Sequence, residues 1–151
     1  FWASYIDAPE SKSIHFLETG STIDAPKWVE FCTEKHGTAS TVLHESDTVV
    51  LPFAAPGDLL YANIAPVRYS VHFFYGRVRD HVLIYIFKPG PVVRFAHSPS
   101  GGGNGNPAWD FQLIVPKYEI NKEYLLDMRL VCKPWMDEAD VLKEVRKYLA
   151  P

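Results

Sequence analysis

Titratable side chains lie inside apolar segments of the stretch from Val67 to Gln112. His72, His97 and Asp110 stand among Val, Phe, Ala and Trp, where an imidazole or a carboxylate is costly to bury without a partner. General acid–base catalysis needs two groups that flank a bond, and an imidazole with a carboxylate can supply them. We therefore predict these three residues as the catalytic candidates, although the sequence leaves open whether the protein is an enzyme.

Hydrogen-bonding side chains follow the same stretch with the spacing of strand residues. Arg68 and His72 are predicted to share one strand face, and Asp110 and Gln112 another. Guanidinium, amide, carboxylate and hydroxyl groups bind sugar hydroxyls, and aromatic rings stack on the apolar faces of sugars. The predicted ligand-binding residues are Arg68, Tyr75, Arg94, Ser98, Ser100, Asn106, Trp109, Gln112 and Arg129. The alternative is an ordinary solvent face of an antiparallel sheet, with the aromatic rings in the core.

The segment RFAHSPSGGGNGNPAWD, residues 94–110, is the most distinctive part of the sequence. Three consecutive glycines let the backbone approach a ligand closely or move as a flap. Trp109 follows this loop directly, so we expect its ring to stack on a ligand held beneath the glycines. Arg94, Asp110 and His72 are expected to converge on the same hollow. The alternative is a surface hairpin without a ligand.

Several motifs of catalysis and metal binding are missing from the sequence. The glycine-rich segment lacks the GK[ST] ending of a P-loop, and Ser100 lacks the preceding glycine of a GxSxG elbow. Adjacent strand residues point to opposite faces, which separates His97 from Ser98. The histidines show neither HxH nor HExxH spacing, so no metal site and no cofactor is predicted. A metal-dependent cupin-like enzyme remains an alternative, because distant strands can assemble such a site.

The composition is that of one folded domain. The chain has 151 residues, of which 47% are hydrophobic and 22% charged, so we predict a single domain over residues 1–151. A net charge of -3 without any Lys/Arg-rich run argues against nucleic-acid binding. No apolar run approaches the about 18 residues of a membrane helix.

The cysteines and the first residue bear on the compartment. Cys32 and Cys132 are predicted to be small buried side chains, with a disulfide between them as the alternative. The sequence starts at Phe1 without Met, so we expect a trimmed N-terminus, and the localisation stays unknown.

Short runs of β-branched and aromatic residues between Pro and Gly predict a mostly β protein. The alternating segment 67–75 is predicted as one strand, paired in a hairpin with residues 80–87. Further strands are expected at 13–20, 38–46, 48–53, 92–98, 107–116 and 123–135, and a strand or a short helix at 27–37. Residues 137–150 are predicted as a helix, because they carry an apolar stripe and Asp137 can cap the first turn.

These elements favour an antiparallel β-sandwich or a jelly roll with one C-terminal α-helix, with an α+β fold built on one curved sheet as the alternative. The leading functional hypothesis is a carbohydrate-binding or carbohydrate-active domain with a polar cleft under the glycine-rich loop. The alternatives are a non-catalytic interaction or structural subunit of a homo- or hetero-oligomer, and the cupin-like enzyme. The expected partner is a small molecule or glycan, or a second copy in the subunit hypothesis, and neither nucleic acid nor membrane.

Overall fold

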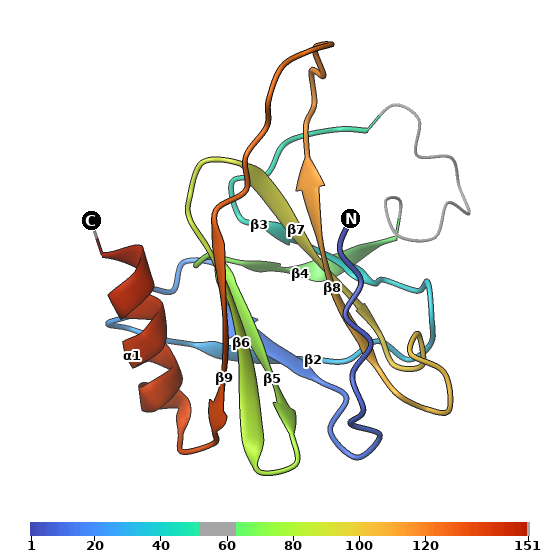
Figure 1. Ribbon diagram of the computed structural model, residues 1–151, viewed down its shortest axis with the longest axis vertical. Helices are drawn as coiled ribbons and strands as arrows, with labels where there is room; N and C mark the ends of the chain where they lie inside the picture. Colours follow the sequence, from blue (N-terminus) through green and yellow to red (C-terminus); the bar gives the residue numbers. More distant parts are fainter. Residues whose placement is uncertain (52–62, 151) are drawn as a thin grey trace.

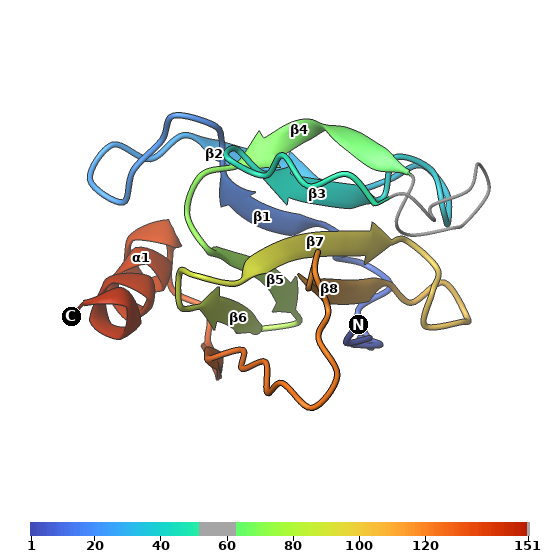
Figure 2. The same cartoon turned by 90° about the horizontal axis from the view of Figure 1, so that it is seen from above.

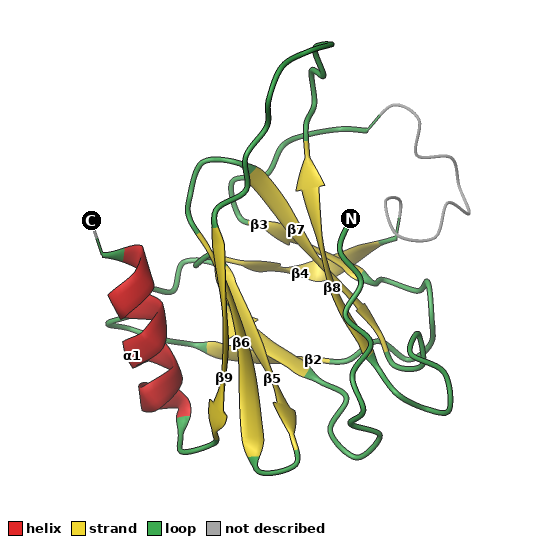
Figure 3. Cartoon of the chain, in the orientation of Figure 1, coloured by secondary structure: helices red, strands yellow, loops and turns green. Residues whose placement is uncertain are grey.

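The computed structural model describes residues 1–51 and 63–150. Within these residues it has nine strands and one helix (Figure 1). The strands are β1 (Ile14–Leu17), β2 (Trp28–Phe31), β3 (Thr41–His44), β4 (Ile64–Tyr69), β5 (Phe73–Val78), β6 (His81–Phe87), β7 (Val92–Ser98), β8 (Ala108–Ile114) and β9 (Met128–Pro134), and the helix is α1 (Glu138–Leu149). The predicted mostly β class with one C-terminal helix is confirmed (Figure 3).

The strands form two sheets that pack on each other as a sandwich. One sheet has the order β2-β1-β5-β6-β9 and the other the order β4-β3-β7-β8. The pair β3–β4 is parallel, so the expectation of a purely antiparallel sandwich is wrong at this position, and a jelly-roll order is not confirmed. The N-terminal residues extend the second sheet beyond β8, because Trp2 exchanges two backbone hydrogen bonds with Phe111.

The segment predicted as one strand over residues 67–75 is divided between the two sheets. β4 ends at Tyr69, β5 begins at Phe73, and residues 70–72 form a bend between the sheets. The prediction that Arg68 and His72 share a strand face is therefore wrong. Neither Pro nor Gly marks the bend, and the residues on both sides of it keep the alternation of a single strand.

Two apolar cores separate three layers of structure, and Figure 2 shows α1 to one side of the strands. The core between the sheets contains Ile14, Phe16, Val42, Ala65, Tyr69, Phe74, Tyr85, Phe87, Val93, Phe95, Trp109 and Phe111. The core between the five-stranded sheet and α1 contains Leu17, Phe73, Tyr75, Val82, Ile84, Ile86, Val141, Leu142 and Val145. The five-stranded sheet is thus covered on both faces, which explains why β5 and β6 are apolar on both sides.

Helix α1 forms where the sequence predicts it. Asp137 is the N-cap, and its side chain accepts a hydrogen bond of 2.8 Å from the backbone N–H of Asp140. Val141, Leu142 and Val145 are its buried residues, which agrees with the predicted stripe.

Several local predictions are corrected by the structure. Cys32 and Cys132 are both exposed and unbridged, so the prediction of buried cysteines is wrong. Residues 48–51 are not a strand, and residues 52 and 53 of that predicted strand lie outside the described residues. β9 starts at Met128, because residues 123–127 belong to the connection from β8.

Candidate functional site

Part of the predicted polar set lies together on the outer face of the four-stranded sheet. Arg94 is opposite Gln112, and Ala96 is opposite Asp110, in the antiparallel pair of β7 and β8. Arg94, Asp110 and Gln112 are all buried, with exposures of 2%, 4% and 1%. The predicted common face of Asp110 and Gln112 is thus confirmed, but the solvated cleft expected above it is not: this face is closed.

Arg94 owes its burial to an ion pair with Asp47. The guanidinium Nε is 2.7 Å from Oδ2 of Asp47, and Nη2 donates to the backbone oxygen of Val49 at 2.6 Å. The two side chains are 2% and 1% exposed. A buried charge must be paired in this way, so Arg94 holds the segment after β3 against the sheet. Its hydrogen-bonding groups face protein atoms.

Asp110 and Gln112 have fewer partners than Arg94. One oxygen of Asp110 accepts a hydrogen bond of 2.9 Å from the backbone N–H of Ser4. Burial raises the pKa of Asp110 to about 6, because the charged form loses its hydration, and the hydrogen bond from Ser4 opposes this shift. Both polar atoms of the Gln112 amide are buried, and neither has a hydrogen-bond partner among the residues that the structure describes.

The glycine-rich loop closes on itself. Gly102 and Gly103 donate to the carbonyl oxygens of Asn106 and Ser100, and Asn106 donates to that of Gly103. The Ser98 hydroxyl lies 2.8 Å from Nδ1 of His36, and its oxygen also accepts from the N–H of Ser100. None of these residues lines either of the two cavities described below, so the loop roofs neither of them.

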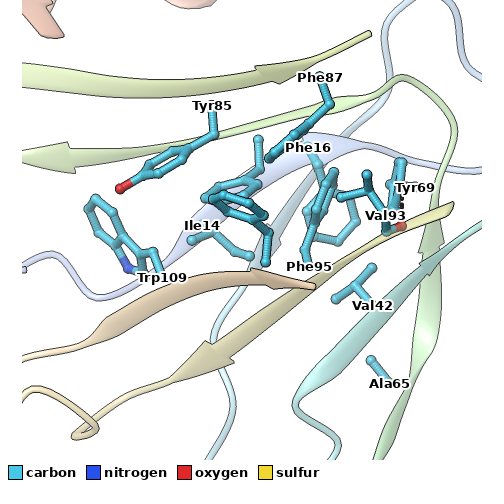
Figure 4. Packing of buried hydrophobic residues seen from close by; sticks show 12 residues of the cluster. Ile14, Phe16, Val42, Ala65, Tyr69, Tyr85, Phe87, Val93, Phe95 and Trp109 are labelled. Carbon is cyan, nitrogen blue, oxygen red and sulfur yellow. Dashed lines mark hydrogen bonds between the residues drawn. The ribbon is translucent and has the colours of Figure 1, made fainter. Parts of the chain in front are cut away.

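Trp109 and His97 belong to the core between the sheets. Trp109 is 0% exposed, so the prediction of a ring face available for stacking on a ligand is wrong; Figure 4 shows it beside Tyr85 in the interior. Its indole N–H donates to the carbonyl oxygen of Lys12 at 2.8 Å, and Nε2 of His97 lies 2.9 Å from the same oxygen. Nδ1 of His97 faces the N–H of Thr33 at 3.2 Å, which leaves neither ring nitrogen for a ligand.

Three other predicted ligand-binding residues are also engaged with the protein. Arg68 donates to the carbonyl oxygens of His44 and Asp47, both at 3.0 Å. Tyr75 lies in the core under α1, and burial raises the pKa of its hydroxyl. Arg129 lies 3.5 Å from Glu144 of α1. These side chains connect elements of the fold and do not share one pocket.

Among the residues predicted as catalytic or ligand-binding, His72 is the one that lines one of the two cavities. It lies in the bend before β5 and lines a cavity of about 290 Å³ together with His44, Ser46, Thr48 and Val92. Its ring stacks on His44, with 4.4 Å between the centroids. His44 bonds to Ser46 and Ser70, but His72 has no hydrogen bond to its ring among the described residues. Burial lowers the pKa of His72 to about 4, so the imidazole is neutral at pH 7.

A larger cavity of about 540 Å³ lies on the other side of the β6–β7 turn. Gly90, Pro91 and Val92 belong to both cavities. Its remaining wall comes from the end of β8 and from the connection to β9: Leu113, Ile114, Val115, Pro116, Lys117, Glu119, Lys122, Tyr124 and Leu125. The sequence does not predict this cavity, because the strands expected at 107–116 and 123–135 leave residues 117–122 without an assigned role. The exposed apolar residues Ile120 and Leu125 near it were the available signal.

Comparisons with known protein families, curated proteins and solved structures give no match to this chain. Among the residues that the structure describes, no group of three or more His, Cys, Asp or Glu side chains is placed to hold a metal ion. Over the same residues, no helix is long and apolar enough to cross a membrane.

Proposed function

We propose that this chain is a binding domain for a small anionic molecule with an apolar body, held in the cavity of about 540 Å³. The observation that carries the proposal is a predominantly apolar wall with lysines at the exposed side. Val92, Leu113 and Ile114 form the sheltered part, whereas Lys117 and Lys122 are exposed. Ligand sites commonly have this volume and this combination of apolar walls with few polar groups.

The charges around the opening favour an anion. Lys122 is paired with Glu119, with 2.5 Å between Nζ and Oε1. The ammonium group of Lys117 has no ion-pair partner in the described part of the chain. One unpaired cation therefore remains beside an apolar surface, which suits a sulfonate or carboxylate attached to a ring or an alkyl chain.

Fluorescence titration with the dye anilinonaphthalene sulfonate tests this proposal. Leu113→Trp fills the sheltered part of the cavity, and Leu125→Asp places a carboxylate at its exposed side; each is expected to weaken binding at least about tenfold. Leu125 is 72% exposed, so its replacement is expected to leave the fold intact. Met136→Ala, at an equally exposed apolar residue outside the cavity, is the control. Equal affinity of all variants would reject this site.

Charge is tested separately in the same titration. Lys117→Glu is expected to weaken dye binding several-fold and to reverse the effect of added salt on the affinity, because the attraction to the sulfonate becomes a repulsion that salt screens. Lys143→Glu, on the exposed side of α1, changes the net charge equally and is expected to leave the affinity within about twofold. An identical effect of both variants would show that only net charge matters.

A polyhydroxylated ligand such as a sugar is a second candidate, in the cavity of about 290 Å³. The imidazole of His72 favours it, because its ring nitrogens have no hydrogen bond in the described part of the chain. A neutral ring can donate one hydrogen bond and accept another beside the hydroxyls of Ser46 and Thr48. Calorimetry with a panel of monosaccharides is expected to show binding that His72→Ala abolishes and His81→Ala retains. The absence of heat with every sugar would remove this candidate. The cupin-like hypothesis stays an untested prediction.

A further inference from the structure

The longest uncovered strand edge in the described chain belongs to β9. β9 is the last strand of the five-stranded sheet and has seven residues. At the opposite edge, β2 has four residues. The outer edge of β8 is covered by the N-terminal residues through Trp2 and Ser4. β4 carries Pro66, which lacks a backbone donor. An uncovered edge of this length is a template for pairing with another strand.

The hydrogen-bonding groups that β9 leaves free can be identified from its register with β6. The carbonyl oxygen of Asp127 accepts from Lys88, and the N–H of Trp135 donates to Asp80, so the odd-numbered residues of this segment bond to the β6 side. In an antiparallel pair the N–H and C=O of one residue point the same way and successive residues alternate. The N–H and C=O groups of Met128, Leu130 and Cys132 therefore point away from β6. The side chain of Leu130 is 53% exposed beside them.

We propose that β9 pairs antiparallel with β9 of a second copy of this chain, around a two-fold axis at Leu130. This arrangement joins the two five-stranded sheets into one. The outward-pointing residues then form the hydrogen-bonded pairs: Leu130 with the Leu130 of the second copy, and Met128 with its Cys132. Each copy gives three N–H donors and three acceptors, and the two exposed leucines cover each other. The proposal does not depend on the proposed ligand site.

Charge complementarity selects this register over its neighbour. Centred on Leu130, the pairing places Lys133 opposite Asp127, and Arg129 opposite Val131. Centred on Val131, it would place Arg129 opposite Lys133, and like charges opposite each other destabilise a strand pair. Asp127 directly precedes β9 and is exposed. It accepts a hydrogen bond from the hydroxyl of Tyr148, and Lys133 lies 2.8 Å from Asp140 of α1, so the approach of Lys133 to Asp127 across the dimer adds to pairs already formed within each copy.

The helices leave room for this pairing. α1 packs on the outer face of the sheet, with buried contacts to Val82, Ile84 and Ile86 of β6. The β6 strands of the two copies would be three strand spacings apart, about 14 Å. This separation accommodates two helices of about 10–12 Å diameter side by side.

Sedimentation equilibrium of the whole chain tests the dimer. The wild type is expected to dimerise reversibly, and Leu130→Lys, which places two ammonium groups at the axis, is expected to weaken the dimer at least about tenfold. Met136→Lys, at an exposed residue off the edge, is expected to leave the dimer unchanged. Circular dichroism confirms that each variant is folded. A wild-type monomer at every concentration, or a dimer that Leu130→Lys does not weaken, overturns the proposal.

Disulfide trapping tests the register independently of the point variant. In a Cys32→Ser background, Met128→Cys is expected to give a covalent dimer through Cys132, because hydrogen-bonded pairs have Cα atoms about 5.5 Å apart, within disulfide range. Val131→Cys, on the opposite sheet face, is the control and is expected to remain uncrosslinked to Cys132. Crosslinking of Leu130→Cys to Cys132 without crosslinking of Met128→Cys would overturn this register.

Discussion

At the scale of single residues, most polar side chains singled out by the sequence stabilise the fold. Arg94 holds Asp47, and His97 and the indole of Trp109 share the carbonyl oxygen of Lys12. Their residue types suit catalysis and sugar binding, but their ring and guanidinium atoms are occupied by protein partners. His72 differs, because its imidazole faces a cavity without a hydrogen bond in the described part of the chain.

The buried ion pair gives a stability prediction. Arg94→Ala leaves the Asp47 carboxylate buried without its cation, and we expect the free energy of unfolding to fall by about 3–5 kcal/mol. The double variant Arg94→Met with Asp47→Leu removes both charges and is expected to recover most of this loss. Urea denaturation of the wild type, Arg94→Ala and the double variant measures both values. A double variant as unstable as Arg94→Ala would show that the loss comes from packing.

The carboxyl group of Asp110 gives a prediction about pH. Its pKa is about 6 in the folded protein against 3.8 ordinarily, so the folded state binds more protons between these values. The stability of the wild type therefore falls as pH rises through about 6. Asp110→Asn keeps an oxygen that accepts the hydrogen bond from the N–H of Ser4, but its amide does not titrate. As the pH rises from about 4 to about 7.5, we expect the free energy of unfolding of Asp110→Asn to increase by about 1–3 kcal/mol relative to that of the wild type, as measured by urea denaturation. A constant difference would contradict the raised pKa.

At the scale of elements, close packing between the sheets decides which substitutions are tolerated. Gly76 of β5 lies against the ring of Trp109 from β8, and a Cβ at this glycine would be 2.3 Å from the nearest ring atom. This contact links two strands of different sheets, far apart in the sequence. The glycine is thus required by the indole and not by backbone geometry.

Gly76→Ala is expected to destabilise the protein by about 1–3 kcal/mol, because the core must shift to admit a methyl group. Trp109→Phe removes part of the ring that Gly76 contacts. The double variant is therefore expected to lose less free energy of unfolding than the sum of the losses in the two single variants. Thermal or urea unfolding of the four proteins measures this coupling. Strictly additive losses would show that the two residues do not clash.

The N-cap of α1 gives a prediction for the helix. Asp137→Ala removes the acceptor for the N–H of Asp140 and is expected to cost about 1 kcal/mol. Asp137→Ser keeps an acceptor oxygen and is expected to restore most of that stability. Urea denaturation followed by far-UV circular dichroism compares the variants. An equal loss in both would assign the effect to charge near the helix terminus and not to the cap.

At the scale of the whole molecule, the layers share residues and must form together. The five-stranded sheet contributes Phe74, Tyr85 and Phe87 to one core and Phe73, Tyr75 and Ile84 to the other. We therefore expect one unfolding transition, with far-UV and near-UV circular dichroism giving coincident curves. An earlier loss of the far-UV signal would show that α1 detaches separately from the sandwich.

The sequence by itself determined the class of the fold, β6 and its pairing with the strand before it, the strands β7 and β8, and α1 with its cap. These features depend on local alternation, turn residues and capping, which short segments carry in full. Even the shared face of Asp110 and Gln112 follows from the two-residue period of one strand.

Only the tertiary structure decided which faces are covered and by what. The partner of Arg94 lies 47 residues earlier in the chain, and Trp109 is buried because a second sheet packs over it. The division of residues 67–75 between sheets depends on pairing with distant strands. The alternation of residues along a strand distinguishes its two faces but does not identify the element that packs on each face. The apolar cavity beside β8 could therefore not be predicted from the sequence.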